Sequence, residues 1–186
     1  MAKARTRTNA VLASVGHATG SAAGPAAPGP AACGIDEAGR GPVVGPLVVA
    51  GVAGDDVEVF RALGCRDSKK VTPDRRRAID RELRKATGVR VAVRVVQPPQ
   101  LDAAMARDTL NVLEMTLFRE IALELGARHV FADAADVRAD RFARQLAEAL
   151  PPGVQVTAEH RADDTYPIVG AASIVAKVAR DAPTMG

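Results

Sequence analysis

Short apolar runs and strict alternation predict strands in the chain from Cys33 onward. "ACGID" (32–36) can form a short buried strand, and "PVVGPLVVAGVA" (42–53) a longer one. The intervening "EAGRG" (37–41) makes the pair a predicted hairpin with a glycine-rich turn. "GVRVAVRVVQ" (88–97) alternates valine with arginine and alanine, which predicts a strand covered on one face.

Two later apolar runs predict further strands, "RHVFAD" (128–133) and "VQVTAEH" (154–160). Helical patterns separate and follow the strands. Thr72 as N-cap and Pro73 at the first helical position open a charged helix over 72–86. The other predicted helices cover 108–125, 138–150 and 171–181, and the first of them places Leu110, Leu113, Leu117, Ile121 and Leu125 on one face.

The order of these elements predicts the fold class. A strand hairpin and a third strand are followed by strand, helix, strand and helix, with no internal repeat. This order indicates an α/β protein in which helices pack against a mixed sheet.

Residues 1–32 have a different composition from the rest of the chain. "ATGSAAGPAAPGPAA" (18–32) is rich in alanine, glycine, proline and serine and cannot bury enough apolar surface to offset its ordering entropy. We expect a disordered extension over 1–32 and a single domain over 33–186. A weaker alternative is a basic arm, formed by Lys3, Arg5 and Arg7, that contacts nucleic acid.

Composition indicates the class of protein, the partners that its charge permits and the cellular compartment that it suits. The 186 residues are 47% apolar and 25% charged, which fits one globular domain. The net charge of +3 permits a nucleic-acid partner without requiring one. Two cysteines in no metal or redox spacing suit a reducing cytoplasm, and neither a membrane-length apolar run nor a secretory leader is expected.

Acidic residues at predicted strand ends suggest a metal site. Asp36 and Glu37 end the first strand, Asp133 ends a later one, and Asp163 follows the last. Functional groups of open α/β sheets gather at strand ends, so these acids can converge. Converging carboxylates repel one another, and Mg²⁺ or Mn²⁺ relieves that repulsion through hard oxygen ligands.

Each acid also has a plainer interpretation. Asp133, Asp136 and Asp140 can be loop acids that lead into a helix N-terminus, and Asp163 and Asp164 can serve a helix entry in the same way. Asp36 and Glu37 fit this interpretation less well, because an apolar strand end beside glycine is a poor place for two idle charges. Both carboxylates can serve one site only if the strand ends or distorts there, which we therefore expect.

Two basic segments can contact a nucleic acid. In Gly39-Arg40-Gly41 the glycines allow close backbone approach to a sugar hydroxyl, and Arg40 can hold a phosphate. "RDSKK" (66–70) precedes the helix at Thr72, and Lys69 and Lys70 can contact phosphate. A tight turn and a solvated loop are the respective alternatives. His160 and Lys177 are more often surface or supporting residues than catalysts.

Five motifs occur in an order that resembles the ribonuclease HII family, especially its archaeal-style members. They are "GIDEAGRGPVVGPLVVAG", "DSKKVTP", "LNVLE", "FADAADV" and "HRADDTYPIVGAASIVAKVARD", spanning about Gly34 to Asp181. The resemblance implies a ribonuclease H-like fold with a five-stranded mixed sheet flanked by helices. It also implies cleavage of RNA in RNA–DNA hybrids and at single ribonucleotides within duplex DNA, leaving 5′-phosphate and 3′-hydroxyl ends.

The resemblance also assigns site residues and partners. The four acidic positions of the family fall on Asp36, Glu37, Asp133 and Asp163, which would be catalytic and hold Mg²⁺ or Mn²⁺. The turn that recognises the ribonucleotide 2′-hydroxyl through its backbone falls on Gly39, Arg40 and Gly41. The phosphate-contacting loop falls on Ser68, Lys69 and Lys70. The expected partner is a hybrid or ribonucleotide-containing duplex, bound by a monomer away from membranes.

The C-terminus departs from the family pattern. Family members continue through further helices to a "GSGYPSDP"-like segment, whose tyrosine stacks on the sugar at the RNA–DNA junction. This chain ends with "APTMG" after "AKVARD", and Tyr166 belongs to a different motif. We therefore expect a C-terminally truncated catalytic domain. The alternatives are a weakened or inactive hybrid-binding remnant and an unrelated metal-dependent nuclease or transferase on this fold.

Overall fold

The computed structural model describes residues 29–41, 45–65 and 70–182. Within them one five-stranded sheet has the spatial order β3-β2-β1-β4-β5. Its strands are β1 (Ala32–Ala38), β2 (Leu47–Gly54), β3 (Arg90–Val96), β4 (His129–Asp133) and β5 (Gln155–Glu159). β1, β2 and β3 pair antiparallel, whereas β4 runs parallel to β1 and β5 parallel to β4. The predicted five-stranded mixed sheet is confirmed.

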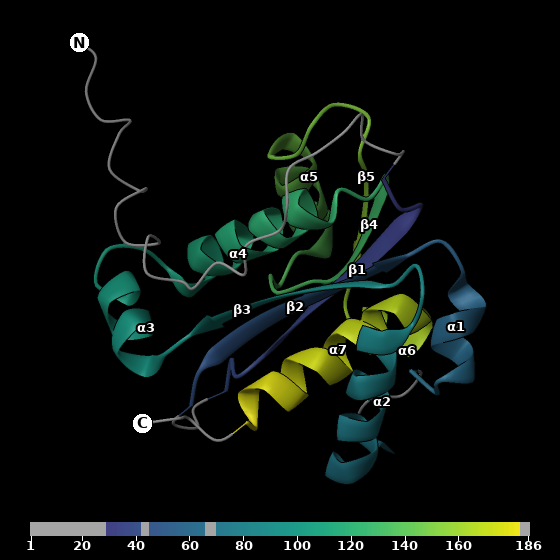
Figure 1. Ribbon diagram of the computed structural model, residues 1–186. Helices are drawn as coiled ribbons and strands as arrows, with labels where there is room; N and C mark the ends of the chain where they lie inside the picture. The colour runs from purple at the N-terminus through teal and green to yellow at the C-terminus, as the bar shows by residue number, and fades with distance from the viewer. Residues whose placement is uncertain (1–28, 42–44, 66–69, 183–186) are drawn as a thin grey trace, which may run out of the picture.

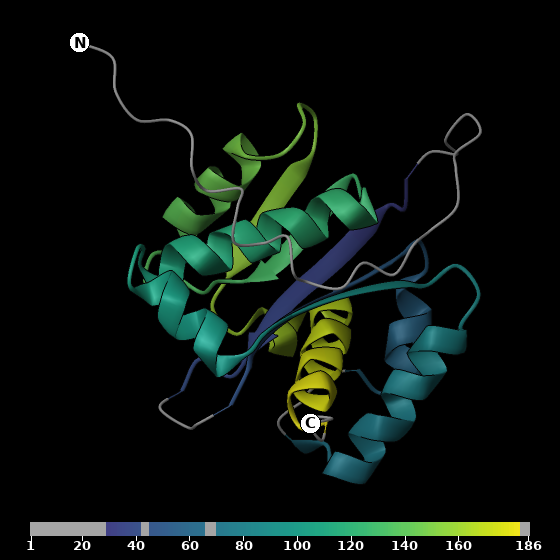
Figure 2. The same ribbon diagram turned by 60° about the vertical axis from the view of Figure 1, so that its left-hand side comes forward.

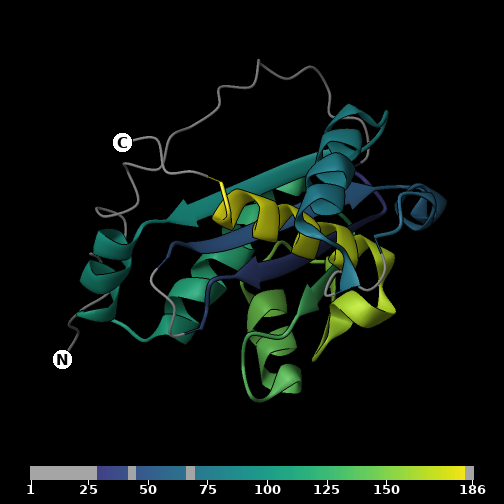
Figure 3. The same cartoon turned by 90° about the horizontal axis from the view of Figure 1, so that it is seen from below.

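The helices cover both faces of the sheet (Figure 1). They are α1 (Val57–Ala62), α2 (Pro73–Lys85), α3 (Pro98–Met105), α4 (Leu110–Leu125), α5 (Ala139–Glu148), α6 (Ala162–Thr165) and α7 (Pro167–Arg180). α4 and α5 lie on one face, and α7 crosses the other, as the view from below shows (Figure 3). α2 packs mainly against α7 and also contacts β3 (Figure 2).

Each sheet face has its own apolar core, and strand alternation separates the two. Cys33 and Ile35 of β1 join the core under α4, while Ala38 joins the core under α7. The same alternation corrects the expectation for β3. Its Ala92 packs under α4, whereas Val91, Val93 and Val95 pack on the α7 side. Both faces of β3 are therefore covered, because arginines on the α4 face bond to α4: Arg94, for example, pairs with Glu120 at 3.2 Å.

Two glycines let α7 approach the sheet and the neighbouring loop. A Cβ on Gly34 of β1 would lie 2.4 Å from the carbonyl carbon of Ile168 in α7. A Cβ on Gly170 of α7 would lie 1.7 Å from the backbone oxygen of Cys65. The prediction that this small-residue helix packs closely on the sheet is therefore confirmed, and the contact brings α7 side chains onto the end of β1.

Several boundaries differ from the sequence pattern. Short helices α1, α3 and α6 were not predicted, and α7 begins at Pro167 rather than at Ala171. The first strand continues through Glu37 to Ala38, and the second begins at Leu47 rather than Pro42. At the N-terminus, Pro30 and Ala31 accept hydrogen bonds from the backbone of Arg128 and His129. Ordered structure thus precedes Cys33, while the rest of the expected extension, 1–28, lies outside the described residues.

Candidate active site

Asp36, Asp133 and Asp163 form a compact carboxylate group. One oxygen from each lies within 4.8 Å of the other two. The register explains the first pair. Ile35 of β1 lies opposite Ala132 of the parallel strand β4, so the next residues, Asp36 and Asp133, are neighbours with the same facing. Asp163 arrives from the first turn of α6, which packs on β4.

Asp36 occupies a position where a negative charge is costly without a cation. Its side chain is 6% exposed. Burial, followed by the repulsion of Asp133, raises the pKa of Asp36 to about 7. Two hydrogen bonds act in the opposite direction, one from the hydroxyl of Ser173 and one from the backbone N–H of Glu37 at 2.7 Å. Three converging hard oxygen ligands in this setting fit a divalent cation such as Mg²⁺ or Mn²⁺.

Arg161 ties the turn between β5 and α6 to Asp133. Its φ of 60° places it in the left-handed region, where it turns the chain from β5 into α6. Its backbone N–H donates to Asp133 Oδ1 at 3.2 Å, and its side chain pairs with Asp164. The backbone of one residue therefore orients one acid of the group and leads directly into the helix that carries another, Asp163, which is 2% exposed.

Glu37 corrects the expectation about the neighbouring acid pair. β1 is unbroken through Glu37, which lies opposite Val49 of β2, so no distortion turns both carboxylates to one side. Asp36 faces Ser173 of α7, whereas Glu37 faces Glu114 of α4 and is absent from the compact group. The Asp36 and Glu37 side chains project from opposite faces of β1. Asp133 lies beside Asp36 in the compact group.

Glu37 nevertheless remains electrostatically linked to the carboxylate group. Burial raises its pKa well above the usual value, and Asp36, Glu114 and Asp133 raise it further, while Arg40 lowers it. Its Oε2 is buried without a hydrogen-bond partner among the described residues. A buried unpaired carboxylate oxygen next to other acids is a costly arrangement that a bound cation or an added donor would relieve.

The segment Gly39–Gly41 leaves β1 as a turn. Gly39 has a φ of 102°, and a Cβ on it would lie 2.2 Å from the backbone oxygen of Pro46. Only glycine meets both conditions without strain. Gly41 is exposed, and within the described residues no atom lies within 4 Å of a Cβ position on it, so none of them closes the outer side of the turn.

Arg40 is held by the protein itself. Its Nε and Nη2 donate to the two oxygens of Glu114 at 2.8 and 2.7 Å, and Nη2 also donates to Asn111 Oδ1 at 2.7 Å. Two of its three guanidinium nitrogens are thus engaged on α4, and a phosphate contact by Arg40 stays a prediction. The other predicted phosphate contacts are Lys70, which is exposed just before the N-cap Thr72, and Ser68 and Lys69, which lie outside the described residues.

The remaining acids near the site carry structural roles. Asp136 pairs with Arg141, and Asp140 in the first turn of α5 pairs with Arg138 at 3.2 Å. Hydrogen bonds from the Arg138 backbone and the Arg141 side chain hold the pKa of Asp136 below its usual value. The plainer interpretation thus fits these two residues. Tyr166 packs its ring on Phe131, and its hydroxyl donates a hydrogen bond to Glu159.

Four residues that support the site were not selected from the sequence. Asn111 and Glu114 lie three residues apart in "LNVLE", on the same side of α4, and this spacing was the available signal. Ser173 and Lys177 lie four residues apart on α7, and Lys177 Nζ donates to Ser173 Oγ at 2.8 Å. The sequence indicated only that Lys177 is a surface or supporting residue rather than a catalyst. Its place beside the group became visible only with the packing of α7.

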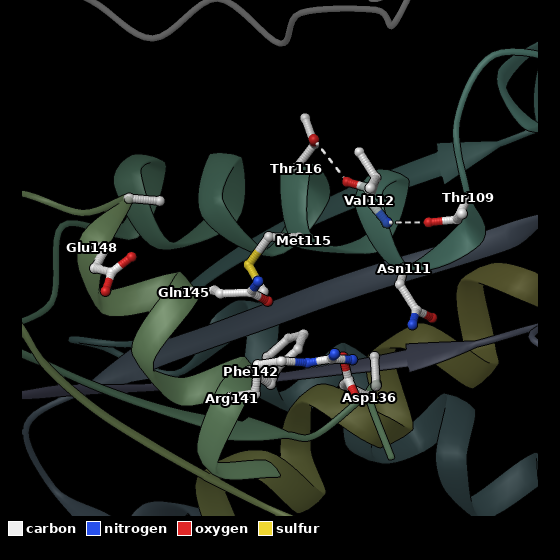
Figure 4. Close-up of a pocket in the computed structure, with 12 residues that line it drawn as sticks. Thr109, Asn111, Val112, Met115, Thr116, Asp136, Arg141, Phe142, Gln145 and Glu148 are labelled. Carbon is white, nitrogen blue, oxygen red and sulfur yellow. Dashed lines mark hydrogen bonds and ion pairs between the residues drawn. The ribbon is translucent and has the colours of Figure 1, made fainter. Parts of the chain in front are cut away.

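A pocket of about 580 Å³ lies between α4 and α5 (Figure 4). Asn111, Met115 and Thr116 line it from α4, and Phe142 and Gln145 from α5. None of the three clustered acids lines this pocket. Its link with the site is Asn111, which also accepts the hydrogen bond from Arg40.

The mixed sheet and the carboxylate group at the ends of its central strands define a ribonuclease H-like α/β protein. Residues 33–185 match the family model described as Ribonuclease HII. A ribonuclease HII of Archaeoglobus fulgidus is 47% identical over 148 residues, covering 80% of this chain and 70% of that protein. A ribonuclease HII of Thermococcus kodakarensis is 43% identical over 152 residues, which cover 80% of this chain and 65% of that protein.

A solved structure gives the same result. The complex of PCNA with ribonuclease HII from Archaeoglobus fulgidus matches with a TM-score of 0.75 and 46% identity, covering 81% of this chain and 71% of that one. The chain belongs to the ribonuclease HII family, a family of hydrolases that act on RNA–DNA hybrids. It spans about two thirds of the length of the two relatives named above. Among the described helices, none has the length and apolar character needed to cross a membrane.

Proposed function

We propose that this chain is an endoribonuclease that cuts the RNA strand of RNA–DNA hybrids and cuts at single ribonucleotides embedded in duplex DNA. The observation that carries the proposal is the group formed by Asp36, Asp133 and Asp163, with oxygens within 4.8 Å of one another. Family membership supplies the substrate class. The products would carry 5′-phosphate and 3′-hydroxyl ends.

The three clustered carboxylates would hold Mg²⁺ or Mn²⁺, with Glu37 contributing from the other side of β1. When bound, the cation supplies an activated water and stabilises the departing 3′ oxygen. The protein's own groups prepare this site. The Ser173 hydroxyl and the Glu37 N–H hold the Asp36 carboxylate by hydrogen bonds, and the Arg161 N–H holds Asp133.

Substrate recognition would fall to two segments, Gly39–Gly41 and Ser68–Lys70. RNA differs from DNA at the 2′-hydroxyl, which a backbone-lined turn at Gly39–Gly41 can contact on its open side. Ser68, Lys69 and Lys70 would contact phosphates and fix the register of the duplex without reading its sequence. We propose that the protein acts on this substrate as a monomer in the cytoplasm.

The test is cleavage of a duplex that contains one ribonucleotide, with Mg²⁺ or Mn²⁺ present. Wild-type protein should cut 5′ to the ribonucleotide and leave an all-deoxy duplex intact. Asp36→Asn and Asp163→Asn should each lower kcat by at least about a hundredfold. Asp140→Asn is the matched control, because Asp140 is exposed and paired on α5.

Other outcomes would contradict the proposal in different ways. Cleavage that persists in Asp36→Asn or without a divalent ion would exclude the metal mechanism. Binding of the hybrid without turnover at saturating metal would identify a hybrid-binding remnant instead. Cutting with no preference for the ribonucleotide would indicate another nuclease activity on the same fold.

A further inference from the structure

Glu114 is a charged residue that the proposed chemistry does not use. Its side chain is fully buried in the second turn of α4, with 0% exposure. Burial raises the pKa of Glu114, and the hydrogen bonds and charge of Arg40 lower it. The pair is half-buried, since the Arg40 side chain is 36% exposed, and such an ion pair is often no more stabilising than apolar side chains of the same volume. The pair therefore needs a reason other than stability.

The pair ties a turn to a helix at a defined distance and angle. The Arg40 guanidinium presents Nε and Nη2 to the two Glu114 oxygens at 2.8 and 2.7 Å, a two-pronged contact that fixes orientation as well as distance. Asn111, one helical turn earlier, accepts a third hydrogen bond at 2.7 Å. These bonds span more than seventy positions of sequence and join the end of β1 to α4.

Gly39 and Gly41 flank Arg40 and differ in their surroundings. Gly39 packs against the backbone of Pro46, whereas no atom of the described residues lies within 4 Å of a Cβ position on Gly41. Glycine is the most freely rotating residue of a chain, so a Gly-Arg-Gly segment without an anchor would sample many conformations. The Arg40 side chain supplies that anchor.

The same pair also controls where the Arg40 charge lies. Arg40 lowers the pKa of Glu37, so the guanidinium is already close enough to act on that acid. Glu114 provides a competing buried carboxylate on α4, at hydrogen-bond distance. A guanidinium released from Glu114 would leave the Gly39–Gly41 turn without its hydrogen-bonded tie to α4.

We propose that Glu114, assisted by Asn111, is a positioning residue for ribonucleotide recognition, which it serves by holding Arg40 and thereby the Gly39–Gly41 backbone. This inference rests on the proposed function. It assigns Arg40 an internal partner in place of a substrate phosphate. It also separates the recognition machinery, anchored on α4, from the carboxylate group, which is packed against α7.

Glu114→Gln tests the inference, with Glu120→Gln as matched control. Glu120 lies on the same helix and pairs with Arg94 at 3.2 Å, away from the turn. With a single-ribonucleotide duplex and saturating Mg²⁺, Glu114→Gln should raise KM about tenfold and reduce the preference for ribonucleotide over all-deoxy duplex by a similar factor. The Mn²⁺ affinity of Glu114→Gln, measured by calorimetry, should stay within about twofold of wild type. The KM, the ribonucleotide preference and the Mn²⁺ affinity of Glu120→Gln should also stay within about twofold of wild type.

Two further variants keep the test decisive if Glu114→Gln folds poorly by circular dichroism. Asn111→Ala removes an exposed acceptor and should shift KM in the same direction by about threefold. Arg40→Ala should itself weaken recognition, and adding Glu114→Gln to it should change KM by less than about twofold, because Glu114 acts through Arg40.

The outcomes separate this inference from the proposed function. If wild type shows no ribonucleotide preference, the proposed function fails. If wild type shows that preference and Glu114→Gln behaves like Glu120→Gln, the positioning role is wrong. Loss of Mn²⁺ affinity in step with kcat would also overturn it, since Glu114 would then support the metal site rather than recognition.

Discussion

Lys177 and Ser173 form a hydrogen bond one turn apart on α7, from Nζ to Oγ at 2.8 Å. The Ser173 hydroxyl in turn bonds the Asp36 carboxylate and lowers its pKa against the larger effect of burial. A lysine that donates to a hydroxyl leaves the hydroxyl proton directed at the acid. α7 therefore supplies a short polar chain that favours the ionised form of Asp36, the form that a cation requires.

Removing the hydrogen bonds that run from Lys177 through Ser173 to Asp36 should weaken metal binding more at low pH than at high pH. Ser173→Ala deletes a hydrogen bond to the carboxylate, so the pKa of Asp36 should rise further and Mn²⁺ affinity at neutral pH should fall by about tenfold. Lys177→Met should act in the same direction with a smaller effect. Calorimetry between pH 6 and 8 measures the change, and an affinity unchanged at every pH would contradict this role.

The raised pKa of Asp36 also predicts a pH-dependent stability without metal. The folded-state pKa of about 7 exceeds the ordinary value of 3.8, so the folded chain binds this proton more tightly than the unfolded chain. The contribution is fully present below about pH 4 and is lost as pH rises through about 7. In EDTA, the unfolding free energy of wild type relative to Asp36→Asn should fall over this window.

Restoring the metal checks that interpretation. Mg²⁺ or Mn²⁺ should raise the melting temperature of wild type most at high pH, because the ion binds the ionised carboxylates. Asp36→Asn should lose most of this increase. A wild-type stability parallel to that of Asp36→Asn at every pH would mean that folding does not raise the pKa of Asp36.

The close approach of α7 to β1 predicts a large effect of one methyl group. A Cβ on Gly34 would lie 2.4 Å from the Ile168 backbone, which cannot move aside as a flexible side chain can. Gly34→Ala should lower the unfolding free energy by about 3 kcal/mol and weaken Mn²⁺ binding, because it pushes Ser173 away from Asp36. Gly45→Ala is the control.

Among the described residues, no atom lies within 4 Å of a Cβ position on Gly45. Its alanine variant should stay within about 0.5 kcal/mol of wild type in urea unfolding. Equal stabilities for the two variants would show that α7 has room to shift on the sheet.

The left-handed conformation of Arg161 predicts a difference between two substitutions. Arg161→Gly relieves the cost of φ 60° but loses the pair with Asp164, whereas Arg161→Ala loses the pair and keeps the strain. The glycine variant should therefore be more stable than the alanine variant by about 1 kcal/mol. Both retain the backbone N–H to Asp133, so cleavage should persist, and equal stability would contradict the argument.

Local sequence patterns predicted the strands, the long helices and the fold class. Alternation or short apolar runs marked every strand of the sheet, and Thr72 with Pro73 marked the start of α2. Asp36, Asp133 and Asp163 could be placed at one site because strand ends are readable from sequence and the family resemblance aligned them. Short helices such as α1, α3 and α6 were missed, since a few residues show no helical period.

Sequence by itself determined which chemical groups are available and, through the motifs, the family. Tertiary structure decided how they are shared between the two faces of β1. The register with β4 put Asp36 and Asp133 on the α7 face, and alternation put Glu37 on the α4 face beside Arg40 and Glu114. Such partnerships join residues far apart in the chain. They depend on strand register and helix packing, which local patterns do not encode.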